Sequence, residues 1–208
     1  MIIFDFDGTL ADTITLGISL INDYSERFKY DKITQEDKEH LSTFELVKKM
    51  GIKFWKLPYL VWFLRKKVGE KADEINIFPG IKELLNDLQT SGYKLGIITS
   101  NSSSTVADFL KRNDIASYFS YIKTNVPAFG KKVAIFKAKK QLKRDFVYVG
   151  DEIRDIEACR LSNIPVISVT WGFNSLASLE QHNPGLVAKT PEEALKLIKQ
   201  TAEQYFKS

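Results

Sequence analysis

The chain has 208 residues, of which 44% are hydrophobic and 27% charged, an ordinary composition for a folded globular protein. Its formal net charge of +4 comes mostly from scattered lysines, so no nucleic-acid partner is expected. The single cysteine excludes an internal disulfide, and no apolar run reaches the ~20 residues that span a bilayer. With no readable signal peptide, these features predict a cytoplasmic protein without a membrane partner and leave its oligomeric state open.

The first predicted element is a buried strand at residues 1–4. This short apolar run, MIIF, is typical of a strand in a parallel sheet that is covered on both faces. Asp5 and Asp7 follow at its carboxyl end, and Gly8 lets the backbone turn sharply. Acids at this end of a parallel strand lie where α/β proteins build their sites. An Asx-turn leaving the strand is the alternative, and this stretch alone leaves both interpretations open.

Residues 14–76 are predicted to be helical, without a convincing strand. Apolar residues recur at helical spacing from Ile14 to Phe28, which indicates a first helix. A second helix is expected from an N-cap at Thr34, paired with Asp37 in a weak capping box, through Leu41 to Met50. A third is expected from Pro58 to about Val68.

Helices and strands alternate from residue 77 onward. Strands are predicted at 94–99, 118–123, 146–149, 165–169 and, as a short sixth, 186–188. Helices are predicted at 81–91, around 106–110, at 133–142, at 153–161 and from 191 to about 205. This alternation predicts an α/β protein with a doubly wound parallel sheet. The expected domains are an α/β core, residues 1–13 and 77–208, and a helical domain, residues 14–76, inserted over the strand ends.

Polar residues also follow the second predicted strand. Thr99, Ser100 and Asn101 stand at a strand-to-helix turn, where free N–H groups and the helix dipole favour an anion. They would equally serve as a cap for the next helix. Lys131 and Lys132 open a later helix, where a positive charge is unfavourable unless it faces an anion. A solvated surface lysine is the alternative interpretation.

A second acidic group follows the fourth predicted strand. Gly150 allows the chain to turn, Asp151 lies at the strand end, and Asp155 falls on the first helical turn, with Glu152 between them. Acids at a helix N-terminus are also favoured structurally, which explains part of the run. Carboxylates that converge on one site repel one another unless a cation joins them. Oxygen ligands with incomplete protein coordination suit Mg²⁺.

These four segments resemble, in order, the four motifs of the haloacid dehalogenase superfamily. The match to the first motif, an apolar run followed by DxDGT, is unbroken from Ile2 to Thr9. Thr99, with Ser100 as the competing residue, corresponds to the second motif, and Lys131, with Lys132 as runner-up, to the third. The segment from 147 to 155 is similar to the fourth, hhhGDxxxD, where h is apolar. The chain most resembles phosphoglycolate phosphatase-like members, which often carry a turn similar to 170–173, TWGF.

The resemblance implies a Mg²⁺-dependent phosphatase acting on a small phosphorylated metabolite through an aspartyl-phosphate. Asp5 is implied as the nucleophile, and Asp7 as the general acid and base. A carboxylate oxygen of Asp5, the backbone carbonyl of Asp7 and Asp151 would hold Mg²⁺. Asp155 and Glu152 would support those ligands. The implied phosphate-binding residues are Thr99, Ser100, Asn101 and Lys131.

The resemblance leaves two other functions open. A sugar phosphomutase uses the same four motifs, and a non-catalytic binding protein on this fold is the alternative from another class. The intact acids weigh against the binding protein. Carbon–halogen cleavage is disfavoured, because the superfamily's dehalogenases lack an acid where this chain has Asp7.

The helical domain is implied to act as a cap over the site. Its segment 54–64 is the most aromatic in the chain and precedes three basic residues. Part of the segment is expected to form the cap's own core. We expect at least one of Trp55, Tyr59 and Trp62 to face Asp5 across the cleft.

Overall fold

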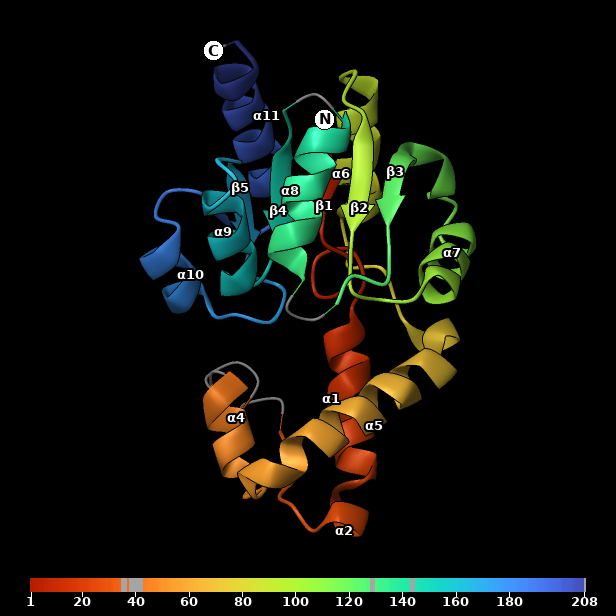
Figure 1. Ribbon diagram of the computed structural model, residues 1–208. Coiled ribbons are helices and arrows are strands. Elements are labelled where there is room, and N and C mark those ends of the chain that lie inside the picture. Colours follow the sequence, from red (N-terminus) through yellow and green to blue (C-terminus); the bar gives the residue numbers. More distant parts are fainter. Residues whose placement is uncertain (35–36, 38–42, 128–129, 143–144, 208) are drawn as a thin grey trace. The chain divides into compact units, whose positions relative to one another are not determined.

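The computed structural model describes residues 1–34, 37, 43–127, 130–142 and 145–207 (Figure 1). Contacts between residues divide the chain into two compact units, one formed by Met1–Asp12 with Asn76–Ser208 and the other by Thr13–Ile75. The first unit contains the sheet, and the second is helical in the part described. Among the described residues, no helix is both long and apolar enough to cross a membrane.

The first unit is built on a six-stranded sheet in which every neighbouring pair of strands is parallel. In spatial order the strands are β3 (Phe119–Lys123), β2 (Leu95–Ile98), β1 (Ile2–Phe4), β4 (Val147–Gly150), β5 (Val166–Val169) and β6 (Val187–Ala188). This order confirms the predicted α/β class with a doubly wound parallel sheet.

The first strand of the chain lies in the middle of the sheet. Ile3 of β1 is paired with Gly96 of β2 on one side and with Tyr148 of β4 on the other. From β1 the chain winds outward through β2 and β3, and then returns to β4 and winds the other way. The winding therefore reverses between β1 and β4, and the carboxyl ends of these strands mark the position where doubly wound proteins bind ligands.

Helices cover both faces of this sheet (Figure 1). On one face α8 (Lys131–Leu142) packs against α9 (Ile153–Arg160), which in turn contacts α10 (Leu176–His182). On the other face α6 (Ile81–Thr90) packs against α11 (Pro191–Lys207), and α7 (Ser103–Arg112) follows β2. Ile3 and Tyr148 belong to the buried core on the α8 and α9 side. Because side chains alternate along a strand, the residue two positions after Ile3 points to that side as well.

The second unit consists of α1 (Thr13–Asp23), α2 (Ser25–Phe28), α4 (Thr43–Lys49) and α5 (Leu57–Glu70), with short 3₁₀ helices at Phe54–Lys56 and Ala72–Glu74. Its core contains Tyr30, Ile33, Met50 and Leu60. The side chains of the aromatic segment 54–64 differ in exposure. Leu60 and Phe63 are buried, while Trp55, Tyr59 and Trp62 are 53–63% exposed.

The helix predicted from Thr34 to Met50 is described only in part. Thr34 and Asp37 make reciprocal capping bonds, in which Asp37 N donates to Thr34 Oγ1 (3.1 Å) and Thr34 N donates to Asp37 Oδ2 (2.8 Å). Leu41 lies outside the described residues, and the later part of the segment forms α4.

The structure differs from the helical prediction in two places. The helix expected from Ile14 to Phe28 is broken at Tyr24, whose ψ is 4°. The hydroxyl of Ser25 donates to Asn22 O (2.7 Å), a local bond that competes with regular helix geometry. Helix α10 was not predicted, because its seven residues are fewer than the window of about 11–18 residues over which helical periodicity is read.

Asn183, after α10, ties the last two strands together. Its Nδ2 group donates to Val166 O (3.0 Å), Ser168 Oγ (3.0 Å) and Leu186 O (3.2 Å), and its side chain is largely buried. The two hydrogens of this amide are shared among three acceptors that water does not reach easily.

Replacing Asn183 with alanine removes its bonds to Val166 O and Ser168 Oγ, whereas Leu186 O keeps the bond from Ser168 N (2.8 Å). We expect Asn183→Ala to lower the free energy of unfolding by about 1–3 kcal/mol, measured by urea denaturation. Asn86→Ala, on the exposed side of α6, is the matched control and should change that free energy by less than about 0.5 kcal/mol. Equal changes in the two variants would contradict this interpretation of Asn183.

Candidate active site

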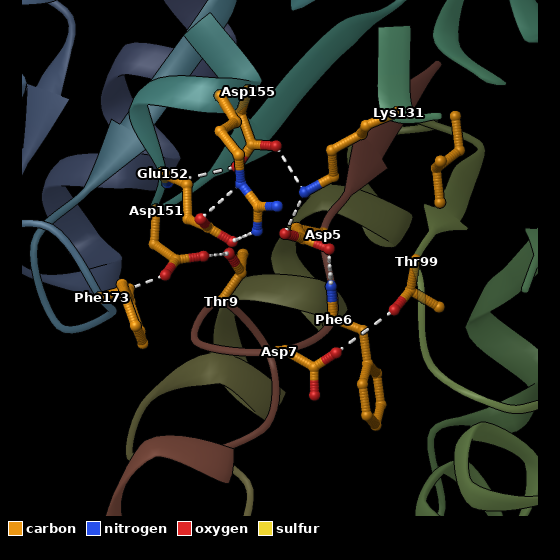
Figure 2. Close-up of polar contacts among 12 residues, drawn as sticks. Asp5, Phe6, Asp7, Thr9, Thr99, Lys131, Asp151, Glu152, Asp155 and Phe173 are labelled. Atoms are coloured by element: carbon orange, nitrogen blue, oxygen red, sulfur yellow. Dashed lines mark hydrogen bonds and ion pairs between the residues drawn. The ribbon is translucent and has the colours of Figure 1, made fainter. Parts of the chain in front are cut away.

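The acidic and basic side chains predicted from the sequence meet at the carboxyl edge of the sheet (Figure 2). Asp5 follows β1, Thr99 follows β2 and Asp151 follows β4, the three central strands of the sheet. Lys131 is the first residue of α8, and Asp155 lies in the first turn of α9. Parallel strands end at one edge, which is why segments far apart in the sequence supply one site.

Asp5 is fixed by contacts to both oxygens of its carboxylate and by a bond from its backbone N–H. Its Oδ1 accepts a hydrogen bond from Phe6 N (2.8 Å), its Oδ2 contacts Lys131 Nζ, and its own backbone N–H donates to Val149 O (2.8 Å). The side chain points to the α8 face of the sheet, as the alternation from Ile3 requires. Burial raises the pKa of Asp5 above its usual 3.8, Lys131 opposes that rise, and the nearby charge of Asp7 adds to it.

Asp5, Asp151 and Asp155 form a buried acidic cluster. One oxygen from each carboxylate lies within 4.8 Å of the other two. Burial raises the pKa of Asp151 well above its usual value, and the charges of Asp5 and Asp155 add to the shift. Burial likewise raises the pKa of Asp155 to about 7, against the opposing effect of Lys131. A cation bound among these oxygens would favour their charged forms, so the cluster could hold a metal ion.

The oxygen atoms of this cluster fit a hard divalent cation. Although burial alone lowers the pKa of Lys131, the charges of Asp155 and Asp5 raise it well above 10.5, so Lys131 stays charged. One lysine nonetheless faces three carboxylates. Asp155 Oδ1 lies 2.5 Å from Lys131 Nζ, yet it accepts no well-directed hydrogen bond from the part of the chain that the structure describes. Buried carboxylate oxygens that outnumber the nearby positive charges are typical of a site for Mg²⁺ or Ca²⁺.

The turn after Asp7 passes directly against Asp151. Gly8 has a φ of +75°, and a Cβ atom added to it would lie 2.3 Å from Asp151 Oδ2. Any other residue would therefore be strained in its backbone and would collide with the carboxylate.

Asp7 points away from this cluster toward the loop after β2 (Figure 2). Asn101 Nδ2 donates to Asp7 Oδ1 (3.0 Å), and Thr99 Oγ1 lies 3.5 Å from Asp7 Oδ2. Thr99 is fully buried and its Oγ1 also accepts from Asn101 N (2.9 Å), whereas Ser100 is exposed. Of the two hydroxyls that the sequence offered, the structure brings Thr99 next to Asp7.

The two neighbouring lysines have different environments in the structure. Lys131 contacts Asp5 and Asp155, while Lys132 is exposed. Glu152 has a smaller part in the cluster than Asp155: its backbone N–H donates to Asp155 Oδ2 (3.2 Å). The carboxylate of Glu152 turns instead to Arg154, accepting from Nε (2.8 Å) and Nη2 (2.6 Å).

Two contacts to Asp151 had no role in the sequence prediction. Thr9 Oγ1 donates to Asp151 Oδ1 (2.8 Å), and Phe173 N donates to Asp151 Oδ2 (2.8 Å). Thr9 was visible as the last residue of the first motif. The Phe173 contact comes from a backbone N–H, which every non-proline residue has, so residue type gives no signal for it.

Comparisons with known proteins show which family this chain resembles. The family model described as "Haloacid dehalogenase-like hydrolase" matches residues 2–169. A phosphoglycolate phosphatase of Synechococcus elongatus is 34% identical over 98% of this chain and 99% of its own length. A phosphoglycolate phosphatase of Agrobacterium fabrum is 28% identical over 86% of this chain and 83% of its own.

A solved structure shows the same fold over almost the whole chain. A haloacid dehalogenase-like hydrolase from Streptococcus pneumoniae superposes with a TM-score of 0.75 and 26% identity, covering 94% of this chain and 96% of its own. The helical region after the first strand is the cap region that the resemblance implied. The four motifs, the sheet order and these relatives lead to one conclusion: the chain belongs to the haloacid dehalogenase-like hydrolases.

Proposed function

We propose that this hydrolase is a Mg²⁺-dependent phosphatase that cleaves a small phosphorylated metabolite through an aspartyl-phosphate on Asp5. The observation that carries the proposal is the placement of Asp5. Its carboxylate is buried, fixed by Phe6 N and Lys131, and lies within the acidic cluster, with Asp7 two residues further along the chain. The similarity to the Synechococcus elongatus enzyme makes phosphoglycolate the first substrate to test.

In the first step Asp5 acts as the nucleophile. A carboxylate oxygen of Asp5 forms a bond to phosphorus as the bond from phosphorus to the substrate's ester oxygen breaks. Asp7 gives its proton to that leaving oxygen, which departs as an alcohol. The bond that Asn101 Nδ2 donates to Asp7 Oδ1 (3.0 Å) orients this carboxyl group.

In the second step water replaces Asp5 on phosphorus. Asp7, now ionised, takes a proton from the attacking water. The bond between Asp5 and phosphorus breaks, and the products are inorganic phosphate and the free Asp5 carboxylate. Asp7 has its proton again and can serve the next substrate molecule.

Charge on the phosphoryl oxygens is balanced by groups around Asp5. Lys131 and the hydroxyl of Thr99 are proposed to bind these oxygens, with Ser100 and Asn101 beside them. Mg²⁺ would be held by Asp5, the backbone carbonyl of Asp7 and Asp151, with Asp155 supporting them. When bound, the ion supplies positive charge to the oxygens that become more negative during transfer.

The helical unit is proposed to act as a separate cap domain that selects the substrate. Its aromatic side chains at 55, 59 and 62 are more than half exposed, so they are not buried in the core of their own unit. Exposed aromatic rings on a cap can exclude water from an acyl phosphate while a substrate is bound.

The first prediction concerns the nucleophile. Asp5→Asn should lower kcat by about 10⁴-fold or more, because an amide is a poor nucleophile with nearly the same shape. Release of inorganic phosphate from phosphoglycolate measures the effect, and thermal denaturation checks the fold. Asp114→Asn, on an exposed residue, is the matched control. Near-normal turnover by a folded Asp5→Asn enzyme would exclude the covalent mechanism.

The second prediction concerns the metal. EDTA should abolish phosphatase activity, and added Mg²⁺ should restore it. Asp151→Asn should raise the Mg²⁺ concentration for half-maximal activity by at least about 10-fold, because it weakens a ligand. Asp87→Asn, on the exposed side of α6, should leave that concentration unchanged. Full activity in EDTA would contradict the metal requirement.

The third prediction concerns the cap. At least one of Trp55→Ala, Tyr59→Ala and Trp62→Ala should lower kcat/KM for phosphoglycolate by about 10-fold, while kcat/KM for p-nitrophenyl phosphate changes much less. The physical reason is that the cap is proposed to match the small, charged glycolate group of the natural substrate, whereas the larger aromatic nitrophenyl group is not matched to it. If all three variants lose activity equally on both substrates, or only melt at lower temperature, the aromatic residues serve packing alone.

A further inference from the structure

The loop after β5, residues 170–174, lies beside the acidic cluster without contributing an acid to it. In the sheet β4 is flanked by β1 and β5, so the loops that follow these two strands stand on either side of Asp151. One oxygen of Asp151 is held from each side, Oδ1 by Thr9 Oγ1 and Oδ2 by Phe173 N, both at 2.8 Å. The two bonds fix the rotation of the carboxylate.

Trp171 joins the two flanking loops directly. Its indole Nε1–H donates to the backbone oxygen of Thr9 (3.0 Å), the residue whose hydroxyl holds Asp151. The indole N–H is a donor and nothing else, so its bond has one possible direction. Trp171 therefore fixes the position from which Thr9 reaches the carboxylate.

The same loop is also fastened to the turn that carries Asp151. Ile153 N donates to Asn174 Oδ1 (2.9 Å), and Asn174 N lies 3.4 Å from Asp151 O. A Cβ atom added to Gly172 would lie 2.2 Å from Asp151 Cβ, so the loop backbone rests against that side chain. Only glycine permits so close an approach.

We propose that residues 170–174 form a clamp that positions Asp151 for the metal ion, and that Trp171 is the positioning residue that ties the clamp to Thr9. The proposal rests on the proposed function in one respect, namely that Asp151 is a metal ligand. In this proposal Trp171 acts through Thr9, to whose backbone oxygen its indole N–H donates. The hydrogen bonds behind metal ligands commonly change metal affinity by about 10–100-fold when they are removed.

The proposed clamp requires the indole N–H of Trp171 in addition to the shape of its ring. A ring that served packing alone would need only its shape, and loss of the N–H would leave Asp151 as well placed as before. A ring that positions Thr9 needs its N–H, so removing that donor should weaken metal binding more than it destabilises the fold.

The test measures metal binding directly, on the full-length protein without substrate. Mn²⁺ serves as the probe for the Mg²⁺ site, and electron paramagnetic resonance of free Mn²⁺ reports its dissociation constant. Trp171→Phe should raise this constant by about 10-fold. Tyr205→Phe is the matched control, since it also removes a donor to a backbone oxygen, that of Asn163 (2.7 Å), and neither residue belongs to the acidic cluster or to the clamp. The Mn²⁺ dissociation constant of Tyr205→Phe should equal that of the unmodified enzyme.

A second replacement removes the donor without shrinking the ring. β-(3-Benzothienyl)alanine has the shape of tryptophan but carries sulfur in place of N–H. The chain has three tryptophans, so Trp55→Phe and Trp62→Phe in the background leave position 171 as the only site of incorporation. Metal affinity is compared with that of the same background carrying tryptophan, and the proposal expects the same weakening as in Trp171→Phe.

A double-mutant cycle tests the route through Thr9. Thr9→Val removes the hydroxyl that holds Asp151, and it should weaken Mn²⁺ binding by itself. Because Trp171 acts through this residue, adding Trp171→Phe to Thr9→Val should cost clearly less than Trp171→Phe costs alone. Fully additive losses would overturn the proposed route.

The outcomes also separate this proposal from the proposed function. Unchanged Mn²⁺ affinity in Trp171→Phe and in the benzothienyl variant, even with a lower melting temperature, would overturn the clamp. A loss of kcat at saturating Mg²⁺ with unchanged affinity would overturn it as well. If Asp151→Asn binds Mn²⁺ as tightly as the unmodified enzyme, the metal site itself has been misassigned.

Discussion

The placement of one lysine among three buried carboxylates is the constraint on which the site depends. Lys131 contacts Asp5 and Asp155, and Asp151 lies within the same cluster. Burial of like charges is costly, so the fold retains them only where a cation and fixed hydrogen bonds offset the repulsion. The sheet order meets this demand, since β1 and β4 are neighbours and α8 starts beside them. The central position of the first strand is therefore a requirement of the chemistry.

Much of this arrangement could be predicted from the sequence, because it depends on residue types at fixed places. Asp5 and Asp151 each follow an apolar run that is typical of a buried strand, and parallel strands end at one edge of the sheet. Asp155 falls on the helical turn that follows Asp151. The lysine was harder, since Lys131 and Lys132 are chemically alike. The structure distinguishes them by helix geometry, because only Lys131 projects toward Asp5. Of Thr99 and Ser100, Thr99 is the buried residue whose hydroxyl lies near Asp7.

The parts that could not be predicted rest on the backbone or on single contacts. The N–H of Phe173 and the turn of Gly172 against Asp151 depend on loop conformation, for which residue type is a poor guide. Helix α10 has only seven residues, too few for a clear periodic pattern. The break at Tyr24 follows from a serine hydroxyl bonding a nearby carbonyl, a choice that propensity does not reveal. Local hydrogen bonds, rather than hydrophobic periodicity, decide these elements.

The central claim is that Asp5 carries the phosphoryl group during turnover, and a trapping experiment tests it most directly. The enzyme is mixed with phosphoglycolate and Mg²⁺, quenched within one turnover and treated with borohydride, which reduces an aspartyl-phosphate to homoserine. Peptide mass spectrometry then locates the change. The account predicts homoserine at position 5 and at no other aspartate. Homoserine at a different position, or unmodified Asp5 in an enzyme that turns over normally, would contradict it.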